Sequence, residues 1–149
     1  HVSPEKSSVR GSAIPCLRYR DAQSAIEWLC EVQGFEQQLF VPGEAGDVVH
    51  AQLTLGNVMV MLSSGGGHQG KLAEILRPPI DRDAIRAQSI HIVVRNIDDH
   101  YAHAVAGGAE IVMGNQDQEY GGRGYTCRDP EGNFWSFGSY DPWVEIDAS

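Results

Sequence analysis

Histidines at alternating positions in two apolar segments are the side chains best suited to chemistry in this sequence. In residues 48–55 (VVHAQLTL), His50 and Gln52 share one face of an extended chain, and aliphatic side chains dominate the other face. In residues 90–95 (IHIVVR), His91 lies on the polar face in the same way. An imidazole titrates near neutral pH and can serve as an acid or a base. We expect His91 to line a pocket, whereas His50 and Gln52 fit a pocket and a solvated face equally well.

Residues 65–71 (GGGHQGK) match the phosphate-loop pattern GxxxxGK. The next residue is Leu72, where a phosphate loop needs a hydroxyl for Mg²⁺, and the following segment soon reaches Pro78 and Pro79. No parallel-sheet pattern surrounds it. We therefore interpret this segment as part of a linker and not as a nucleotide site.

The remaining histidine and cysteine spacings give no metal site. His100 and His103 are three residues apart on an expected helix, a spacing that metal sites use, but no third ligand converges on them. We expect them on a solvated helix face. The three cysteines are far apart and form no CxxC pair, which argues against a disulfide framework and a cysteine zinc site. This usage fits a reducing, cytoplasmic setting.

Charge and length restrict the classes of partner. The chain has 149 residues, with 11 Lys and Arg against 20 Asp and Glu, and a net charge of −9. An acidic chain lacks the cationic face that nucleic-acid binding needs, so we expect no nucleic-acid partner. No run of about 18 apolar residues occurs, so we expect no membrane partner either. The negative charge favours a cationic or neutral ligand.

The order strand, helix, strand, strand, strand occurs twice along the chain. The first helix has an N-cap at Asp21 and ends before Gly34. The first round contains expected strands at 14–19, 35–41, 48–55 and 58–62, and a helix at 22–32. The second contains expected strands at 89–95, 109–113, 124–128 and 134–140, and a helix at 98–106, while a short helical piece at 71–76 lies between the two rounds.

This repetition indicates an internal duplication. Arg18 matches Arg95 at an offset of 77 residues, and a Gly-Asn pair recurs at an offset of 76 residues. We therefore predict an α+β fold of two βαβββ modules whose curved mixed sheets enclose a cleft, with the helices outside. The expected organisation is a disordered tail at 1–12, one domain at 13–141 and a C-terminal tail at 142–149. Within the domain, module one is 13–63, the linker 64–87 and module two 88–141.

The chain resembles the vicinal oxygen chelate superfamily of glyoxalase I, extradiol dioxygenases and bleomycin resistance proteins. The resemblance covers about residues 12–141. It rests on residues 120–125 (YGGRGY) before the turn 129–135 (DPEGNFW), and on residues 18–22 (RYRDA) before a helix that ends at 34–36 (GFE). The likeness is to small, uncharacterised glyoxalase-like or bleomycin-resistance-like members.

The resemblance implies metal ligands on the first and last strands of each module in the catalytic members. Carried over onto this chain, those positions are Ile14, His91, Val60 and Ser136. Only His91 can coordinate a metal, and such sites need about three protein ligands. We therefore expect no metal and no cofactor. The exception is an atypical site in which His50 or Gln52 joins His91, as part of a metal-dependent glyoxalase-type lyase or a dioxygenase.

The preferred hypothesis is metal-independent binding of a small organic, cationic or drug-like molecule in the cleft, by a cytoplasmic homodimer. No general base or nucleophile can be assigned. A third hypothesis is a structural role, in which a bulge at Gly56 inverts the strand parity and side chains fill the cleft. The side chains that would fill it are Met59, Met61, Trp135 and Phe137. The expected ligand-binding residues are Cys16, His50, Gln52, His91, Val93, Phe134 and Ser136.

Overall fold

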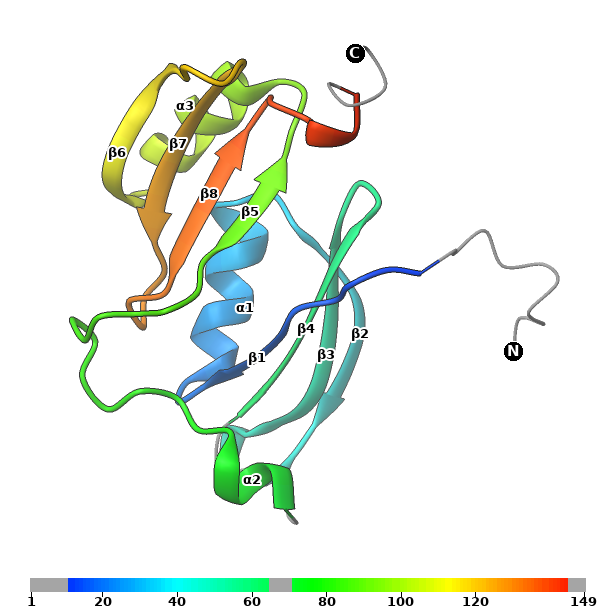
Figure 1. Ribbon diagram of the computed structural model, residues 1–149. Helices are drawn as coiled ribbons and strands as arrows, with labels where there is room; N and C mark the ends of the chain where they lie inside the picture. The colour runs from blue at the N-terminus through cyan, green and yellow to red at the C-terminus, as the bar shows by residue number, and fades with distance from the viewer. Residues whose placement is uncertain (1–10, 65–70, 145–149) are drawn as a thin grey trace, which may run out of the picture.

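Two four-stranded mixed sheets and the helices beside them make up the α+β fold (Figure 1). The computed structural model describes residues 11–64 and 71–144, so most of the expected N-terminal tail, the glycine-rich part of the GxxxxGK segment and the last five residues lie outside it. Module one contains β1 (Cys16–Tyr19), α1 (Ala22–Glu31), β2 (Glu36–Pro42), the 3-10 turn η2 (Glu44–Gly46), β3 (Val48–Leu55) and β4 (Val58–Ser64). Module two contains β5 (Ile90–Val93), α3 (Ile97–Ala106), β6 (Glu110–Asp117), β7 (Arg123–Arg128) and β8 (Phe134–Gly138), and α2 (Lys71–Ile75) lies in the linker.

The two modules have the same topology, as the duplication predicts. Sheet A has the strand order β1-β4-β3-β2, and sheet B has the order β5-β8-β7-β6. In each sheet the first strand runs parallel to the last strand of its module, and the other neighbours are antiparallel. Cys16 pairs with Met61 in sheet A as His91 pairs with Ser136 in sheet B. Within the described residues, no helix has the length and hydropathy to span a membrane.

The hairpin between β3 and β4 settles the strand parity. Leu55 pairs with Val58 across a two-residue turn, and the ladder continues without a register shift to Ala51 opposite Leu62. Ala51, Leu53 and Leu62 are buried in the core, so the even-numbered residues of β3 point to the opposite face. Gly56 therefore does not invert the strand. Trp135 and Phe137 of β8 also lie in the core, and so the cleft is not filled by them.

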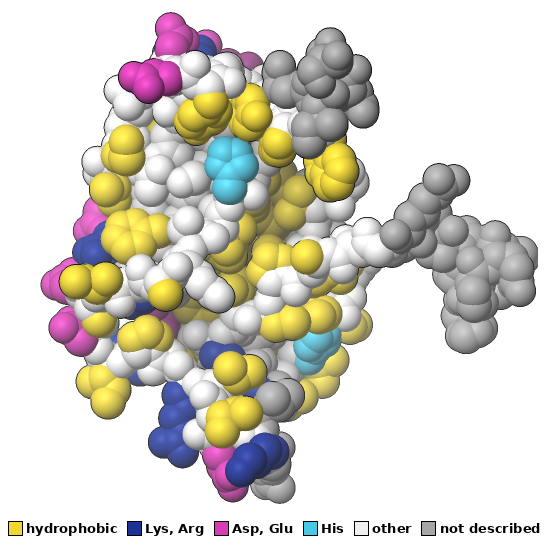
Figure 2. Space-filling view, in the orientation of Figure 1, with side chains coloured by type: hydrophobic (Ala, Val, Ile, Leu, Met, Phe, Trp, Pro, Cys, Tyr) yellow, Lys and Arg dark blue, Asp and Glu magenta, His cyan; other side chains and the backbone are white. Residues whose placement is uncertain are grey.

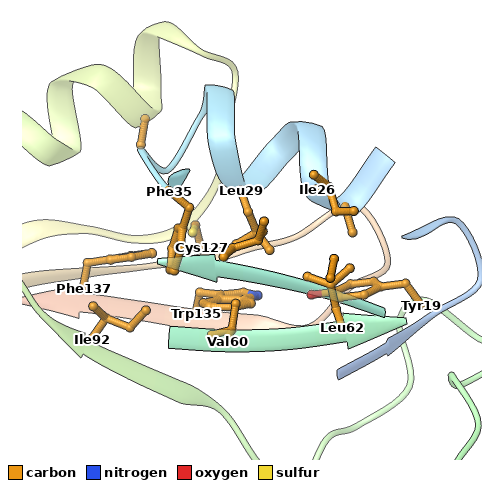
Figure 3. Packing of buried hydrophobic residues seen from close by; sticks show 14 of the residues in the cluster. Tyr19, Ile26, Leu29, Phe35, Val60, Leu62, Ile92, Cys127, Trp135 and Phe137 are labelled. Carbon is orange, nitrogen blue, oxygen red and sulfur yellow. The ribbon is translucent and has the colours of Figure 1, made fainter. Parts of the chain in front are cut away.

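Helix α1 packs against both sheets. Asp21 accepts a hydrogen bond from the Ser24 amide (3.1 Å), which confirms the predicted N-cap. The buried face of α1 contacts sheet A. On the same helix, the ring centroid of Trp28 lies 6.1 Å from that of Trp135 in sheet B. Figure 3 shows Trp135 between residues of both modules, with Leu29 and Val60 nearby. The modules therefore share one hydrophobic core.

Three arginines bind the linker segment after α2 to the two modules. Arg82 and Arg86 donate to the backbone oxygens of Pro130 (3.1 Å) and Glu131 (3.0 Å), and Arg20 of module one donates to the Ile80 oxygen (2.8 Å). A charged donor on a carbonyl is among the stronger hydrogen bonds in proteins. This part of the linker therefore has a defined position between the modules.

The solvated face expected for the two histidines of α3 is found only in part, because His103 is exposed whereas His100 is half-buried, and both bind backbone oxygens. His100 and His103 donate from Nε2 to the backbone oxygens of Gln33 and Glu31, each at 2.9 Å. These carbonyls lie at the end of α1, where no further helical turn uses them. His100 is half-buried, and its Nδ1 lies 2.8 Å from the Tyr125 hydroxyl. The pair joins α3 to α1, a contact between modules that one helix alone cannot reveal.

We expect the free energy of unfolding to fall as the pH drops from about 7 to 5. Desolvation by burial lowers the pKa of His100 in the folded protein, so the unfolded chain binds more protons in this range. Acid therefore favours unfolding. Urea denaturation at several pH values should show a shallower slope for His100→Gln, with His103→Gln as the matched control. An unchanged slope in His100→Gln would contradict this assignment.

Candidate functional site

Each sheet turns one face toward the core and helices, and we call the other its open face. In sheet A a cross-strand row on the open face consists of Cys16, Met61, Gln52 and Leu39. In sheet B the corresponding row is His91, Ser136, Thr126 and Met113. Both rows place small polar groups beside flexible apolar ones. They are the part of each sheet that a bound molecule could contact.

Two adjoining cavities lie beside β1. The linker cavity, of about 470 Å³, lies between β1, β4 and the linker, and its lining includes His50, Met61 and Arg18. The first-strand cavity, of about 400 Å³, lies between β1 and β5, and its lining includes Phe134 and Arg86. The two adjoin because they share lining residues: Cys16, Leu17, Gln88 and Asn133.

A third, smaller cavity of about 180 Å³ lies on the open face of sheet B. His91, Ser136 and Thr126 line it, and the Thr126 and Ser136 hydroxyl oxygens are 2.8 Å apart. The His91 ring lies against β8, since a Cβ placed on Gly138 would be 3.3 Å from its Cε1. Because β8 shields the imidazole from part of the solvent, the pKa of His91 is lowered. The imidazole is therefore neutral at pH 7 and can accept or donate a hydrogen bond.

The structure divides the predicted ligand-binding residues among these cavities. Cys16 lines both cavities beside β1, His50 lines the linker cavity, and Phe134 lines the first-strand cavity. His91 and Ser136 meet in the smaller cavity. Gln52 and Val93 line none of the three cavities. The Gln52 Oε1 atom lies 2.8 Å from His50 Nε2 and so positions that ring. Val93 is 37% exposed.

Several lining residues were not in the predicted set. Thr126 and Arg18 belong to strand faces that the set already used, because Arg18 follows Cys16 by two residues on β1. The alternation pattern could have found both. Gln88, Arg77 and Asn133 come from the linker and the turn before β8. No periodicity marks them, since only the packing of the two modules brings them to the cavity.

The residues at the family's metal positions do not fit a metal ion. The register makes Cys16 and Met61 the counterparts of His91 and Ser136, in place of Ile14 and Val60, which counting along the sequence selected. Val60 is fully buried in the core and cannot be a ligand. In the described part of the chain, no three His, Cys, Asp or Glu side chains are close enough to share an ion. Among the residues that the structure describes, no Asp or Glu lines the cavity of His91.

Two of the three thiols are poor nucleophiles. Burial raises the pKa of Cys127 to about 12, and it also raises the pKa of Cys30. Cys16 is exposed and lines the cavities beside β1. Burial likewise raises the pKa of Tyr125. The Cys30 and Cys127 thiols and the Tyr125 hydroxyl therefore stay protonated at neutral pH and can act as hydrogen-bond donors.

The negative charge of the protein is not concentrated at the cavities. The described linings of all three contain no Asp or Glu, whereas those of the two cavities beside β1 contain Arg18, Arg77 and Arg86. Figure 2 shows hydrophobic and uncharged groups in the hollow between the sheets and acidic side chains toward the outer edges. A net charge of −9 therefore does not indicate the charge of a bound ligand.

Two βαβββ modules with separate mixed sheets, and cavities beside their first strands, define the class of fold. The chain belongs to the Glyoxalase/Bleomycin resistance protein/Dioxygenase superfamily, whose family description matches residues 12–137. This confirms the resemblance noted in the sequence.

Related proteins extend over nearly the whole chain. An uncharacterized protein of Mycobacterium bovis (strain ATCC BAA-935 / AF2122/97) is 29% identical over 145 residues, covering 94% of this chain and 90% of that protein. The crystal structure of TioX from Micromonospora sp. ML1 has a TM-score of 0.64 at 31% identity, covering 86% of this chain and 98% of that chain. The fosfomycin resistance protein FosX from Listeria monocytogenes, complexed with Mn(II) and 1S,2S-dihydroxypropylphosphonic acid, has a TM-score of 0.64 at 10% identity over 93% of this chain and 98% of that chain. The likeness to FosX concerns the fold alone.

Proposed function

We propose that this protein binds a small organic molecule at the cavities beside β1, without a metal ion. The observation that carries the proposal is the adjoining pair of cavities of about 470 and 400 Å³. Each lies within the range typical of small-molecule sites. Their linings combine apolar side chains with a few convergent polar groups. The unsuitability of the family's metal positions supports metal-independent binding.

We also propose that the functional form is a homodimer. Four apolar side chains on the open faces are substantially exposed: Leu39 (42%), Val41 (38%), Val93 (37%) and Met113 (52%). A second copy that covers these faces would remove apolar surface from water. It would also close the site around a ligand.

The metal-dependent alternative requires His50, Gln52 and His91 to converge. His50 and Gln52 already contact each other on sheet A, and His91 lines a separate cavity on sheet B. A lyase or a dioxygenase of this kind would need a different arrangement of the sheets. The test below distinguishes the two functions.

We expect chelator-treated protein to bind at least one class of small organic compound. A panel of aromatic and aliphatic acids, amines and alcohols can be screened by thermal shift, because a ligand that binds only the folded state stabilises it. Binding should be equal with EDTA and with added Mn²⁺, Ni²⁺ or Zn²⁺. A bound compound should also slow alkylation of Cys16, while Cys30, which lines none of the three cavities, serves as the control.

Either of two results would refute the proposal. In the first, no class of compound raises the melting temperature or protects Cys16. In the second, binding appears only with added metal and is lost in His91→Ala, which would favour the metal-dependent alternative. Light scattering on the same samples would show whether the 16.3-kDa chain forms the expected dimer.

A further inference from the structure

Arg18 of β1 has a buried nitrogen without a partner. Its Nη1 has almost no contact with solvent and makes no hydrogen bond. The side chain points from the open face of β1 into the linker cavity, beside Ser63, its pairing partner on β4. Buried polar groups in folded proteins are nearly always hydrogen-bonded, so an exception needs an explanation.

Other arginines near the two cavities have the protein hydrogen-bond partners that Arg18 lacks. Arg82 donates to Pro130 and to the Glu110 carboxylate (3.2 Å), and Arg86 donates to Glu131 and Asn133. These bonds connect the linker to the turn before β8 and to the start of β6. In contrast, no hydrogen bond or ion pair joins Arg18 to any described residue. Arg18 therefore does not fasten one part of the fold to another.

The surroundings of Arg18 favour an oxyanion as the missing partner. A guanidinium binds carboxylates and phosphates through two parallel N–H···O bonds. The described lining of the linker cavity includes Arg77, His50 and Ser63 and contains no carboxylate that could neutralise Arg18. Low-dielectric walls strengthen the attraction between such a site and an anion. A cationic ligand would meet like charge here.

The apolar part of the cavity lining indicates the rest of the ligand. Besides Arg18 and Ser63, the lining includes four apolar side chains: Met61, Leu76, Pro78 and Pro79. The linker that carries both prolines is also bonded to module one through Arg20 and Ile80 (2.8 Å). A compact apolar body with one anionic group matches both parts of this lining.

We propose that the linker cavity binds a small organic oxyanion, with an apolar body against the linker and a carboxylate or phosphate group on Arg18. This inference rests on the proposed function and specifies its ligand class. It differs from the cationic ligand that the net charge favours. Arg18 is the anchor of the site, and Ser63 provides a second hydrogen-bond donor.

The test compares charged and neutral probes of the same shape. Benzoate and phenyl phosphate should bind the full chain in calorimetric titrations, while benzamide and benzylamine should bind at least about tenfold more weakly. Arg18→Gln should weaken binding of both anions by at least about tenfold. Arg95→Gln is the control, because Arg95 follows β5 in module two, is exposed and lines none of the three cavities. It should bind like the wild type.

Stability measurements separate a ligand-binding role from a structural one. Because the buried Nη1 is unpaired, Arg18→Met should melt in the absence of ligand at or above the wild-type temperature, and it should not bind the anions. Arg18→Lys keeps the charge but not the paired donors, and should bind with intermediate affinity. If Arg18→Gln is poorly folded, Arg18→Lys and Arg18→Met still decide the question.

The outcomes distinguish this inference from the function on which it rests. Binding of benzamide or benzylamine as tight as that of benzoate would overturn the oxyanion site and leave small-molecule binding intact. Equal anion affinity in wild type, Arg18→Gln and Arg95→Gln would also overturn it. Failure of every compound to bind would instead count against the proposed function itself.

Discussion

Replacing Asp129 by alanine is expected to lower the free energy of unfolding by about 3–5 kcal/mol, which is a large part of the stability of a typical domain. The carboxylate is 1% exposed. It accepts hydrogen bonds from the Tyr19 hydroxyl (2.7 Å) and from the Trp135 indole (3.1 Å). It also accepts bonds from the backbone amides of Glu131 and Asn133 within its own turn. Alanine would leave buried donors of both modules unpaired.

The loss of stability should be specific to the buried hydrogen-bond network around Asp129. Burial and the nearby carboxylate raise the pKa of Tyr19, so the phenol keeps the proton that it donates to Asp129. Urea denaturation followed by circular dichroism measures the loss. Asp83→Ala is the matched control, because Asp83 pairs with Arg128 at 2.8 Å but its side chain is 75% exposed, and such pairs contribute less than about 1 kcal/mol. Equal effects in the two variants would contradict the proposed role of Asp129.

The local part of the fold could be predicted from the sequence. Alternation gave the bounds of the strand at 48–55 without error, and Asp21 marked the start of the first helix. Bounds shifted by a few residues where tertiary pairing extends a strand, as in β6, which runs to Asp117 instead of ending at Met113. The repeat of the βαβββ order correctly predicted two equivalent sheets, because each module uses the same local signals.

The site was harder to predict because it depends on contacts between the modules. The pattern around His50 and His91 identified strand faces, but it could not show that the two side chains line different cavities. Arg18 gave no signal of its own, since an arginine on a strand is ordinary until its nitrogen is seen to be buried. His100 was misread for the same reason, as its partner is a backbone oxygen of another helix. Net charge says nothing about where the charges lie.

The second large effect is expected for Trp135→Ala, with a loss of about 3–5 kcal/mol. Trp135 is fully buried in β8, with ring centroids 6.2 Å from Phe35 and 6.4 Å from Phe137. Its removal leaves a cavity at the junction of the two modules. It also takes a donor from Asp129. Trp143→Ala is the control, because Trp143 is 77% exposed and its loss should change stability by less than about 0.5 kcal/mol.

The form of the Trp135→Ala transition matters as much as its midpoint. If the modules share one core, as the contact of Trp135 with Trp28 indicates, urea should unfold the variant in a single transition at a lower concentration. Two separate transitions would show that the modules fold independently. The first-strand cavity lies between β1 of one module and β5 of the other, so its shape depends on this junction. A variant that folds but separates the modules should therefore lose ligand binding while keeping every lining side chain.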